Sequence, residues 1–260
     1  MNDSVSNGIA LRHRPQQGGP PLVVLASISL GLLLGGLAIA VVLGGAPPRP
    51  FVASVKDFVV AHPVAIEAAA VGAFASSVPL AIYAATASAR LRQLGVTAPG
   101  ATIALAGGIL AAGALALSGL SLWTLSRPEV TADEPLVRAI YFLVFLTGGP
   151  WHIVGLGLLI AGIAVPSLIL GLLPRPVAWM GLVIAAIAEV TTLVLIWPGF
   201  DVLLPIARVF GLVWLIVAGA QLPLRRARMC PRRGADRAPV RCVRRTPTRL
   251  SRASRPPVPA

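Results

Sequence analysis

Hydrophobic residues occur in long, nearly uninterrupted runs along this chain, and polar residues gather in the short stretches between them. A helix that crosses a membrane needs about 20 mostly apolar residues. On this basis six spans are predicted, at about 21–45, 63–87, 100–125, 151–171, 177–197 and 201–222. The pattern therefore predicts an all-α fold, a polytopic membrane helix bundle of about six transmembrane helices. Gly31 and Gly35 of the first span form a small-xxx-small pair that would let another helix approach closely.

The stretch 136–173 is too long for one span and too short for two spans with a turn. Gly148-Gly149-Pro150 divides it, because proline removes a backbone donor and clashes with the preceding helical turn. The part before the division has the length of an interfacial or half-inserted segment. We therefore expect a short interfacial helix at about 134–147, followed by the fourth span, in which Pro166 is a site for a kink.

The two ends of the chain differ from this body. Residues 1–19 are polar and are interpreted as a disordered leader, residues 20–222 as the transmembrane domain, and residues 223–260 as a disordered tail rich in Arg and Pro. Twelve of the 22 basic residues lie in that tail, a composition that cannot bury a core. The uncharged run 22–45 is longer than the apolar core of a signal peptide, about 7–15 residues, so a retained span is expected.

Composition supports a membrane location. Charged residues make up 12% of the chain and the mean hydropathy is +0.84, whereas a soluble domain carries about 25% charged residues. Lys56 is the single lysine, and this bias toward arginine, alanine and glycine is typical of a GC-rich genome. A bacterial plasma membrane is therefore expected. Cys230 and Cys242 both lie in the tail at a spacing that fits no zinc site.

Orientation follows from the distribution of Lys and Arg in the loops. If the N-terminus is cytoplasmic, the inner segments carry most of these residues: Arg12, Arg14, Arg90, Arg92, Arg175 and the tail. The outer loops then hold Arg49, Lys56, Arg127 and most acidic residues, and an even number of spans makes both termini cytoplasmic. Trp123, Trp151 and Trp197 fall near the outer boundary, as an aromatic belt does.

The basic tail is expected to contact anionic lipids at the inner surface of the bilayer. Nucleic acid is not an expected partner, because the tail has no aromatic side chains on which bases could stack.

Three stretches of the chain resemble a known group of membrane proteins. They are Gly-Gly-Pro-Trp-His at 148–152, Leu-Pro-Arg-Pro-Val-Ala-Trp-Met-Gly-Leu at 173–182, and 203–211 with Arg208. In these residues the chain resembles a bacterial family known as family 4386 of the domains of unknown function. The resemblance covers about His62 to Arg226. It implies six membrane helices and no assigned activity.

Ionisable residues inside the predicted spans are the first candidates for function, since a central charge costs about 2.5–3.5 kcal/mol in a bilayer. They are Glu67, Glu189 and Arg208. With a rise of about 1.5 Å per residue, Glu189 and Arg208 lie at similar depths on spans joined by the Pro198-Gly199 turn, so they are expected to face each other. Such a pair either only locks two helices together or belongs to an outward-open pocket centred on Arg208.

Two histidines and one aspartate complete the candidates. His62 and His152 lie at the predicted outer ends of the second and fourth spans, where they could ligate haem or a metal or simply hydrogen-bond a helix end. No third ligand lies at a suitable spacing, so no metal or other cofactor is expected. Asp201 is expected to be the N-cap of the sixth span.

These features predict an integral membrane protein with a polar cluster of Glu67, Glu189, Arg208 and His152. The first hypothesis is a structural or regulatory helix bundle, for which a homo-oligomer is one form. The alternative is a small-solute or proton-linked permease with an outward-facing polar pocket. An enzyme is not expected, because the sequence has no nucleophile–base pair, metal cluster or phosphate loop.

Overall fold

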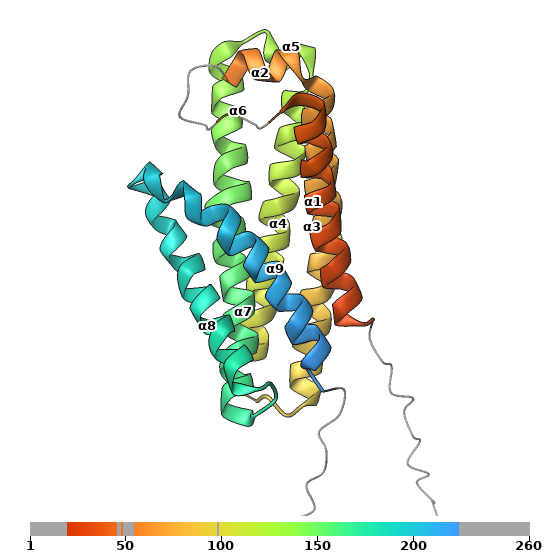
Figure 1. Ribbon diagram of the computed structural model, residues 1–260, viewed down its shortest axis with the longest axis vertical. Helices are drawn as coiled ribbons and strands as arrows, with labels where there is room; N and C mark the ends of the chain where they lie inside the picture. The colour runs from red at the N-terminus through yellow and green to blue at the C-terminus, as the bar shows by residue number, and fades with distance from the viewer. Residues whose placement is uncertain (1–19, 46–47, 49–54, 98, 224–260) are drawn as a thin grey trace, which may run out of the picture. The chain divides into compact units, whose positions relative to one another are not determined.

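The computed structural model describes residues 20–45, 48, 55–97 and 99–223. The predicted leader and almost all of the basic tail lie outside these residues. The described part is helical, without strands (Figure 1). Its helices are α1 (Leu22–Gly44), α2 (Val55–Ala61), α3 (Pro63–Gln93), α4 (Gly100–Leu125), α5 (Pro128–Thr131), α6 (Glu134–Leu146), α7 (His152–Leu170), α8 (Arg175–Val190) and α9 (Leu203–Gln221). A π turn, η1 (Thr147–Trp151), and two 3-10 helices, η2 (Thr191–Leu195) and η3 (Pro198–Val202), join some of them.

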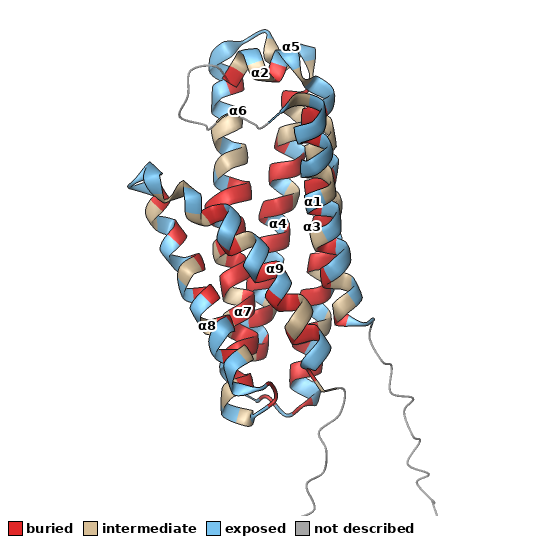
Figure 2. Cartoon of the chain, viewed as in Figure 1, coloured by how far each residue is buried: buried red, intermediate tan, exposed pale blue. Residues whose placement is uncertain are grey.

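Six helical stretches in the described residues are long and apolar enough to cross a membrane, which confirms the predicted number. They are 22–44, 63–93, 100–125, 134–170, 175–195 and 198–221. Around the bundle, each span packs against the next: α1 against α3, α3 against α4, α4 against α7, α7 against α8, α8 against α9, and α9 back against α1. The six spans therefore form a closed circuit of neighbours, and their buried residues face one another within it (Figure 2).

Glycine lets α1 and α3 approach to backbone contact. A Cβ added to Gly36 would lie 2.6 Å from the Cα of Gly72, so neither position has room for a side chain. In the same interface Ser29 Oγ donates to the carbonyl of Ser76 at 3.0 Å, and Ser76 Oγ donates to the carbonyl of Ser29 at 2.7 Å. Small residues and interhelical hydroxyl bonds are the usual means of packing helices in lipid, where burial of apolar surface gives no advantage.

Two buried aromatic residues tie α9 to its neighbours. Tyr83 of α3 donates its hydroxyl to the carbonyl of Leu215 at 2.9 Å, and Trp214 donates its indole N–H to the carbonyl of Val177 on α8 at 2.8 Å. A buried tyrosine or tryptophan needs a partner for its polar atom. These bonds therefore fix the rotation of α9 between α3 and α8.

The predicted interfacial helix is α6, but it is not separated from the fourth span. The π turn η1, which contains Pro150, carries the helix on into α7, and the whole stretch has 37 residues. At about 1.5 Å per residue it is about 55 Å long, which exceeds the roughly 30 Å hydrocarbon core of a bilayer. Helix α7 also continues through Pro166. Neither proline ends the helix, and Pro150 lies in a π turn, an irregularity that occurs as a single turn inside α-helices.

The predicted belt of tryptophans does not lie at one level. Ser118 of α4 faces Gly148, and α4 runs antiparallel to α7. On α4, Trp123 lies five residues beyond Ser118, toward one end of the bundle. On the antiparallel helix, Trp151 lies three residues beyond Gly148, toward the other end. Eight residues of helix rise about 12 Å, so Trp151 lies much deeper in the bundle than Trp123.

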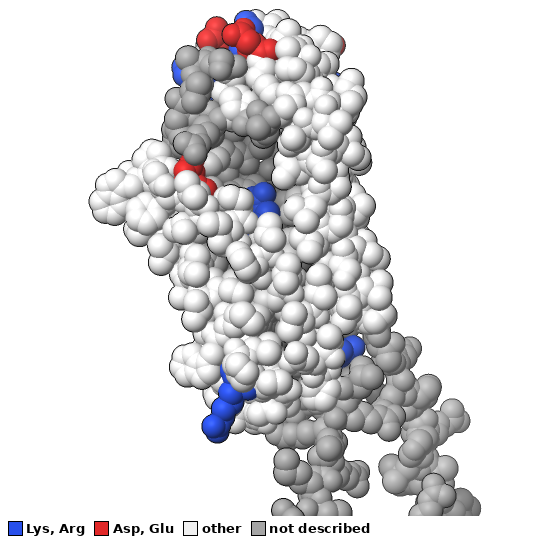
Figure 3. Space-filling model, in the orientation of Figure 1, with Lys and Arg blue, Asp and Glu red and all other residues white. Residues whose placement is uncertain are grey.

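Helix α1 begins at the same end of the bundle at which helix α9 ends. A Cβ on Gly219 of α9 would lie 2.9 Å from the Cβ of Leu22, the first residue of α1. Basic side chains lie at this end, and most acidic side chains lie at the opposite end, over α2 and α5, where basic side chains are also present (Figure 3). Arg138, exposed on α6, adds a basic residue that the loop count from the sequence did not include.

Candidate functional site

Arg208 lies on α9 where this helix passes the π turn. Its Nη2 donates a hydrogen bond to the carbonyl oxygen of Gly148 in η1. Arg208 is the only basic residue of α9. Its guanidinium thus binds the backbone of a neighbouring span.

The π turn explains why a carbonyl needs such a donor. A π turn shifts the backbone hydrogen bonds out of the α-helical register, and Pro150 has no N–H to give. Side chains supply donors around it: Thr147 Oγ1 donates to the carbonyl of Leu143 at 2.7 Å, and Ser118 Oγ of α4 donates to that of Val144 at 3.2 Å. Arg208 is the third of these donors.

His152 is fully buried at the start of α7. Its Nδ1 lies 2.9 Å from the carbonyl oxygen of Ala111 on α4. A carbonyl oxygen only accepts, so Nδ1 carries the proton and Nε2 has a free lone pair. Among the described residues Nε2 has no hydrogen-bond partner, and neither has Nε of Arg208. The surroundings of η1 therefore hold one unpaired acceptor and one unpaired donor.

Glu189 does not pair with Arg208, which corrects the expectation from the sequence. Glu189 is exposed near the end of α8, and the described residues include no ion pair between it and Arg208. Gly181 and Ala185 of α8 are buried, but the eight residues from Gly181 to Glu189 make about 2.2 helical turns, which rotates Glu189 about 80° from Gly181. The link to α9 is also longer than a two-residue turn, because η2 and η3 occupy it.

Glu67 has a partner that the sequence did not suggest. Its Oε1 accepts from Nη2 of Arg127, just after α4, and from Ser126 Oγ at 3.3 Å. The Arg127 and Glu67 side chains are 35% and 41% exposed. The Arg127 guanidinium also lies over the Trp123 ring, 4.3 Å from its centroid. Arg127 had been assigned to a loop, and only the packing of α3 on α4 brings it to Glu67.

The four predicted cluster residues therefore occupy three places. Arg208 and His152 flank the π turn, Glu189 points outward, and Glu67 is bound to Arg127. Gly148 lies opposite Ser118, and the neighbouring Gly119 packs on Phe74 of α3. Phe74 is seven residues from Glu67, so the Arg208 contact lies about 10 Å from the level of Glu67.

The remaining candidates have local roles. His62 Nδ1 lies 3.2 Å from the carbonyl of Phe58, whose ring centroid is 5.0 Å from the imidazole. No group of three His, Cys, Asp or Glu residues in the described ranges could hold a metal ion. Asp201 is not the N-cap of α9, because Val202 occupies that position and Asp201 lies in η3. Its carboxylate is still near the positive end of the last span, where an acidic group is favourable.

The fold and these contacts define a class, a helical bundle with six stretches able to span a membrane. Comparisons with known protein families, with curated proteins and with solved structures found no match for this chain. The resemblance to family 4386 stays a prediction, and a function has to be argued from the chain's own geometry.

Proposed function

We propose that this chain is a structural or regulatory helix bundle of the bacterial plasma membrane, with no catalytic step. The observation that supports this best is that its intramembrane polar groups fasten its own helices. Arg208 joins α9 to η1, His152 joins α7 to α4, and Glu67 joins α3 to the residues after α4. Polar groups that bond to one another across helices hold a bundle in one arrangement.

In this proposal both termini face the cytoplasm. The support is the end of the bundle that carries Arg90, Arg92 and Arg175, since cytoplasmic loops are enriched in basic residues. The basic tail, which lies outside the described residues, would then contact anionic lipids of the inner leaflet. Self-association into a homo-oligomer is compatible with this role and is measured in the experiments below.

The experiment compares Arg208→Leu with the matched control Glu189→Gln in detergent-purified protein. If the role of Arg208 is structural, Arg208→Leu should have a lower midpoint of thermal unfolding, because the Gly148 carbonyl loses its donor at a cost of about 1–3 kcal/mol. Glu189→Gln should unfold like the parent, because Glu189 is exposed and unpaired with Arg208. An unchanged or higher midpoint for Arg208→Leu would mean that the Arg208 charge does not stabilise the fold, and the structural proposal would then be wrong.

The second candidate function is the small-solute or proton-linked permease. The specific observation in its favour is that two buried atoms near η1, Nε2 of His152 and Nε of Arg208, have no hydrogen-bond partner among the described residues. Vesicles with reconstituted protein and an internal pH dye separate the two functions. The structural proposal predicts no proton flux above that of empty vesicles. Flux that Arg208→Lys and His152→Phe both abolish would establish the permease instead.

A further inference from the structure

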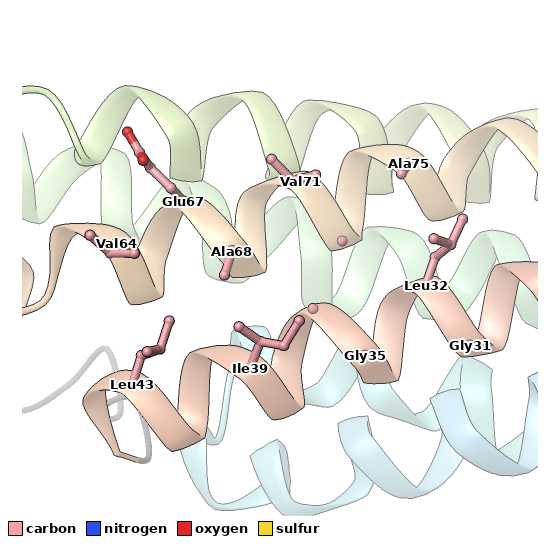
Figure 4. Close-up of a pocket in the computed structure, with 12 residues that line it drawn as sticks. Gly31, Leu32, Gly35, Ile39, Leu43, Val64, Glu67, Ala68, Val71 and Ala75 are labelled. Carbon is pink, nitrogen blue, oxygen red and sulfur yellow. The ribbon is translucent and has the colours of Figure 1, made fainter.

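Two apolar grooves run along the outward face of α3, one on each side. The α1–α3 groove has a volume of about 540 Å³, and its lining includes Gly31, Gly35 and Leu43 of α1 (Figure 4). The α3–α4 groove has a volume of about 350 Å³ and reaches Trp123 of α4. Val71 and Ala75 of α3 line both. The two grooves are therefore neighbours, separated by one ridge of α3.

The α1–α3 groove exists because Gly31 and Gly35 meet no partner helix. Nothing lies within 4 Å of the position that a Cβ would take at either residue. The close approach that their spacing predicted is made instead by Gly36, one position further, against Gly72. The result is a channel between α1 and α3 that is floored by backbone and walled by apolar side chains (Figure 4).

The length of the groove matches one leaflet of a bilayer. Its lining on α1 runs from Gly31 to Leu43, which is about 18 Å of helix, and half of a hydrocarbon core is about 15 Å. Beyond Gly31 the same face of α1 continues with exposed Val24 and Ile28, which line neither groove. The hollow part of this face is therefore about as long as one acyl chain, whereas a spanning helix contacts a surface through the whole core.

Both grooves end at the same polar group, the pair of Glu67 and Arg127. Glu67 lies within the lining of the α1–α3 groove and points to the side of α3 away from α1 (Figure 4). Arg127 covers Trp123, at the end of the α3–α4 groove. The ion pair uses Oε1 and Nη2, so the carboxylate keeps Oε2 and the guanidinium keeps Nη1. Both side chains are partly exposed, at 41% and 35%.

We propose that this face binds one two-chain phospholipid with a zwitterionic phosphoethanolamine headgroup. One acyl chain lies in the α1–α3 groove and the other enters the α3–α4 groove, on either side of the Val71 ridge. The phosphate accepts hydrogen bonds from Arg127, and the ammonium group donates to Glu67. Because the protein pair has no net charge, it complements a headgroup that carries both signs. A headgroup with only the phosphate charge would leave Glu67 without a partner for its free oxygen.

This inference depends on membrane insertion and does not depend on the structural role proposed above, so the two can fail separately. The experiment is native mass spectrometry of the purified full chain, delipidated and then mixed with equal amounts of phosphatidylethanolamine and phosphatidylglycerol. We expect one retained phosphatidylethanolamine per chain. Glu67→Gln with Arg127→Gln should bind it about tenfold more weakly, since charge-assisted bonds to the headgroup are lost.

Two glycine variants test the groove itself. Gly35→Leu fills the α1–α3 groove and should abolish lipid retention. Gly113→Leu is the matched control, because Gly113 of α4 also has nothing within 4 Å of its Cβ position and lines neither groove. Equal retention by Gly35→Leu and Gly113→Leu would overturn the proposal, and so would equal retention of both lipids. A lipid-free dimer of the parent chain that Gly35→Leu dissociates would overturn it as well, by assigning the groove to a second copy.

Discussion

Polar residues in this bundle form hydrogen bonds between helices through hydroxyl and carbonyl groups as much as through charged groups. Arg208 donates to a carbonyl, and the Ser29–Ser76 pair consists of two reciprocal bonds between a hydroxyl and a carbonyl. In lipid such bonds have no competition from water, yet they stabilise modestly, by about 0.6 kcal/mol on average and at most about 1.7. Their value lies in fixing which faces of two helices meet.

The Ser29–Ser76 pair provides a prediction at this scale. Ser76→Ala should lower the free energy of unfolding by about 1 kcal/mol, because it removes the hydroxyl that donates to the Ser29 carbonyl, whereas the Ser29 hydroxyl keeps the backbone carbonyl of residue 76. Ser121→Ala on α4 is the matched control, since the described contacts give its hydroxyl no interhelical bond. The measurement is unfolding in mixed micelles followed by circular dichroism. Equal midpoints for the two variants would contradict the assigned role of the pair.

From the sequence we could predict the depth of each polar residue in its span, and residues were paired on the basis of depth alone. Glu189 and Arg208 were expected to meet because their depths agree, yet the rotation of Glu189 about α8 and the 3-10 helices after it prevent the pair. Arg127 could not be assigned to Glu67 from the sequence, because that contact depends on how α3 and α4 cross. The depth of a residue follows from counting along a helix, whereas its partner follows from the packing of two helices.

The positions of the glycines and one π turn determine how the helices of this bundle pack. The sequence predicted the six spans closely because length and hydropathy decide them. It predicted a division at 148–150, where the structure has a continuous helix with a π turn. Proline and two glycines are compatible with either outcome, and the donors that make the π turn tolerable, Ser118 and Arg208, come from other helices. This part of the fold was beyond a reading of local sequence.

Two glycines of α1 should respond in opposite ways to alanine. Gly36→Ala places a methyl group 2.6 Å from the Cα of Gly72 and should destabilise the bundle by about 1–3 kcal/mol through overpacking. Gly31→Ala has open space at its Cβ and should be neutral or stabilising by up to about 1 kcal/mol, because alanine favours the helix. Thermal unfolding in detergent compares them. Similar destabilisation by both would show that α1 does not pack as described.

Deletion of Gly149 tests the π turn. A π turn contains one residue more than the α-helix needs, so its removal should let α6 and α7 form a regular helix and rotate α6 by about 100°. Val137, which is 1% exposed, should then become accessible. A single cysteine at this position, with Cys230 and Cys242 replaced by serine, should react with a water-soluble maleimide only in the deletion variant. Arg138→Cys, at an exposed position, should react in both backgrounds, and protection of Val137→Cys in both would contradict the prediction.

In the described part of the chain the six spans form a circuit in which each packs against the next and α9 packs back against α1. The two ends of these spans differ in charge: most acidic residues lie over α2 and α5, among some basic ones, and basic residues lie at the other end (Figure 3). Its outer surface is largely apolar, as shown by exposed residues such as Val42 at 85% and Ile169 at 76%. A surface of this kind suits lipid, and the charge difference between the ends bears on orientation.

Orientation is testable with cysteines at opposite ends. In a background without native cysteines, Glu129→Cys in α5 should react with a membrane-impermeant reagent added to intact cells. Arg175→Cys, at the start of α8, should react only after the cells are permeabilised. The reverse pattern would place both termini outside. Reaction of both cysteines in intact cells would contradict the assignment of these residues to opposite ends of the spans.

The contact between α1 and α9 has a consequence for how the protein is made. A chain synthesised from its N-terminus inserts α1 first and α9 last, so the circuit closes only when nearly the whole body has left the ribosome. Until then the Tyr83 hydroxyl lacks the Leu215 carbonyl, and the α9-facing surface of α1, including Leu22, is uncovered. The unfinished bundle therefore presents an open side to the membrane and to any insertion machinery.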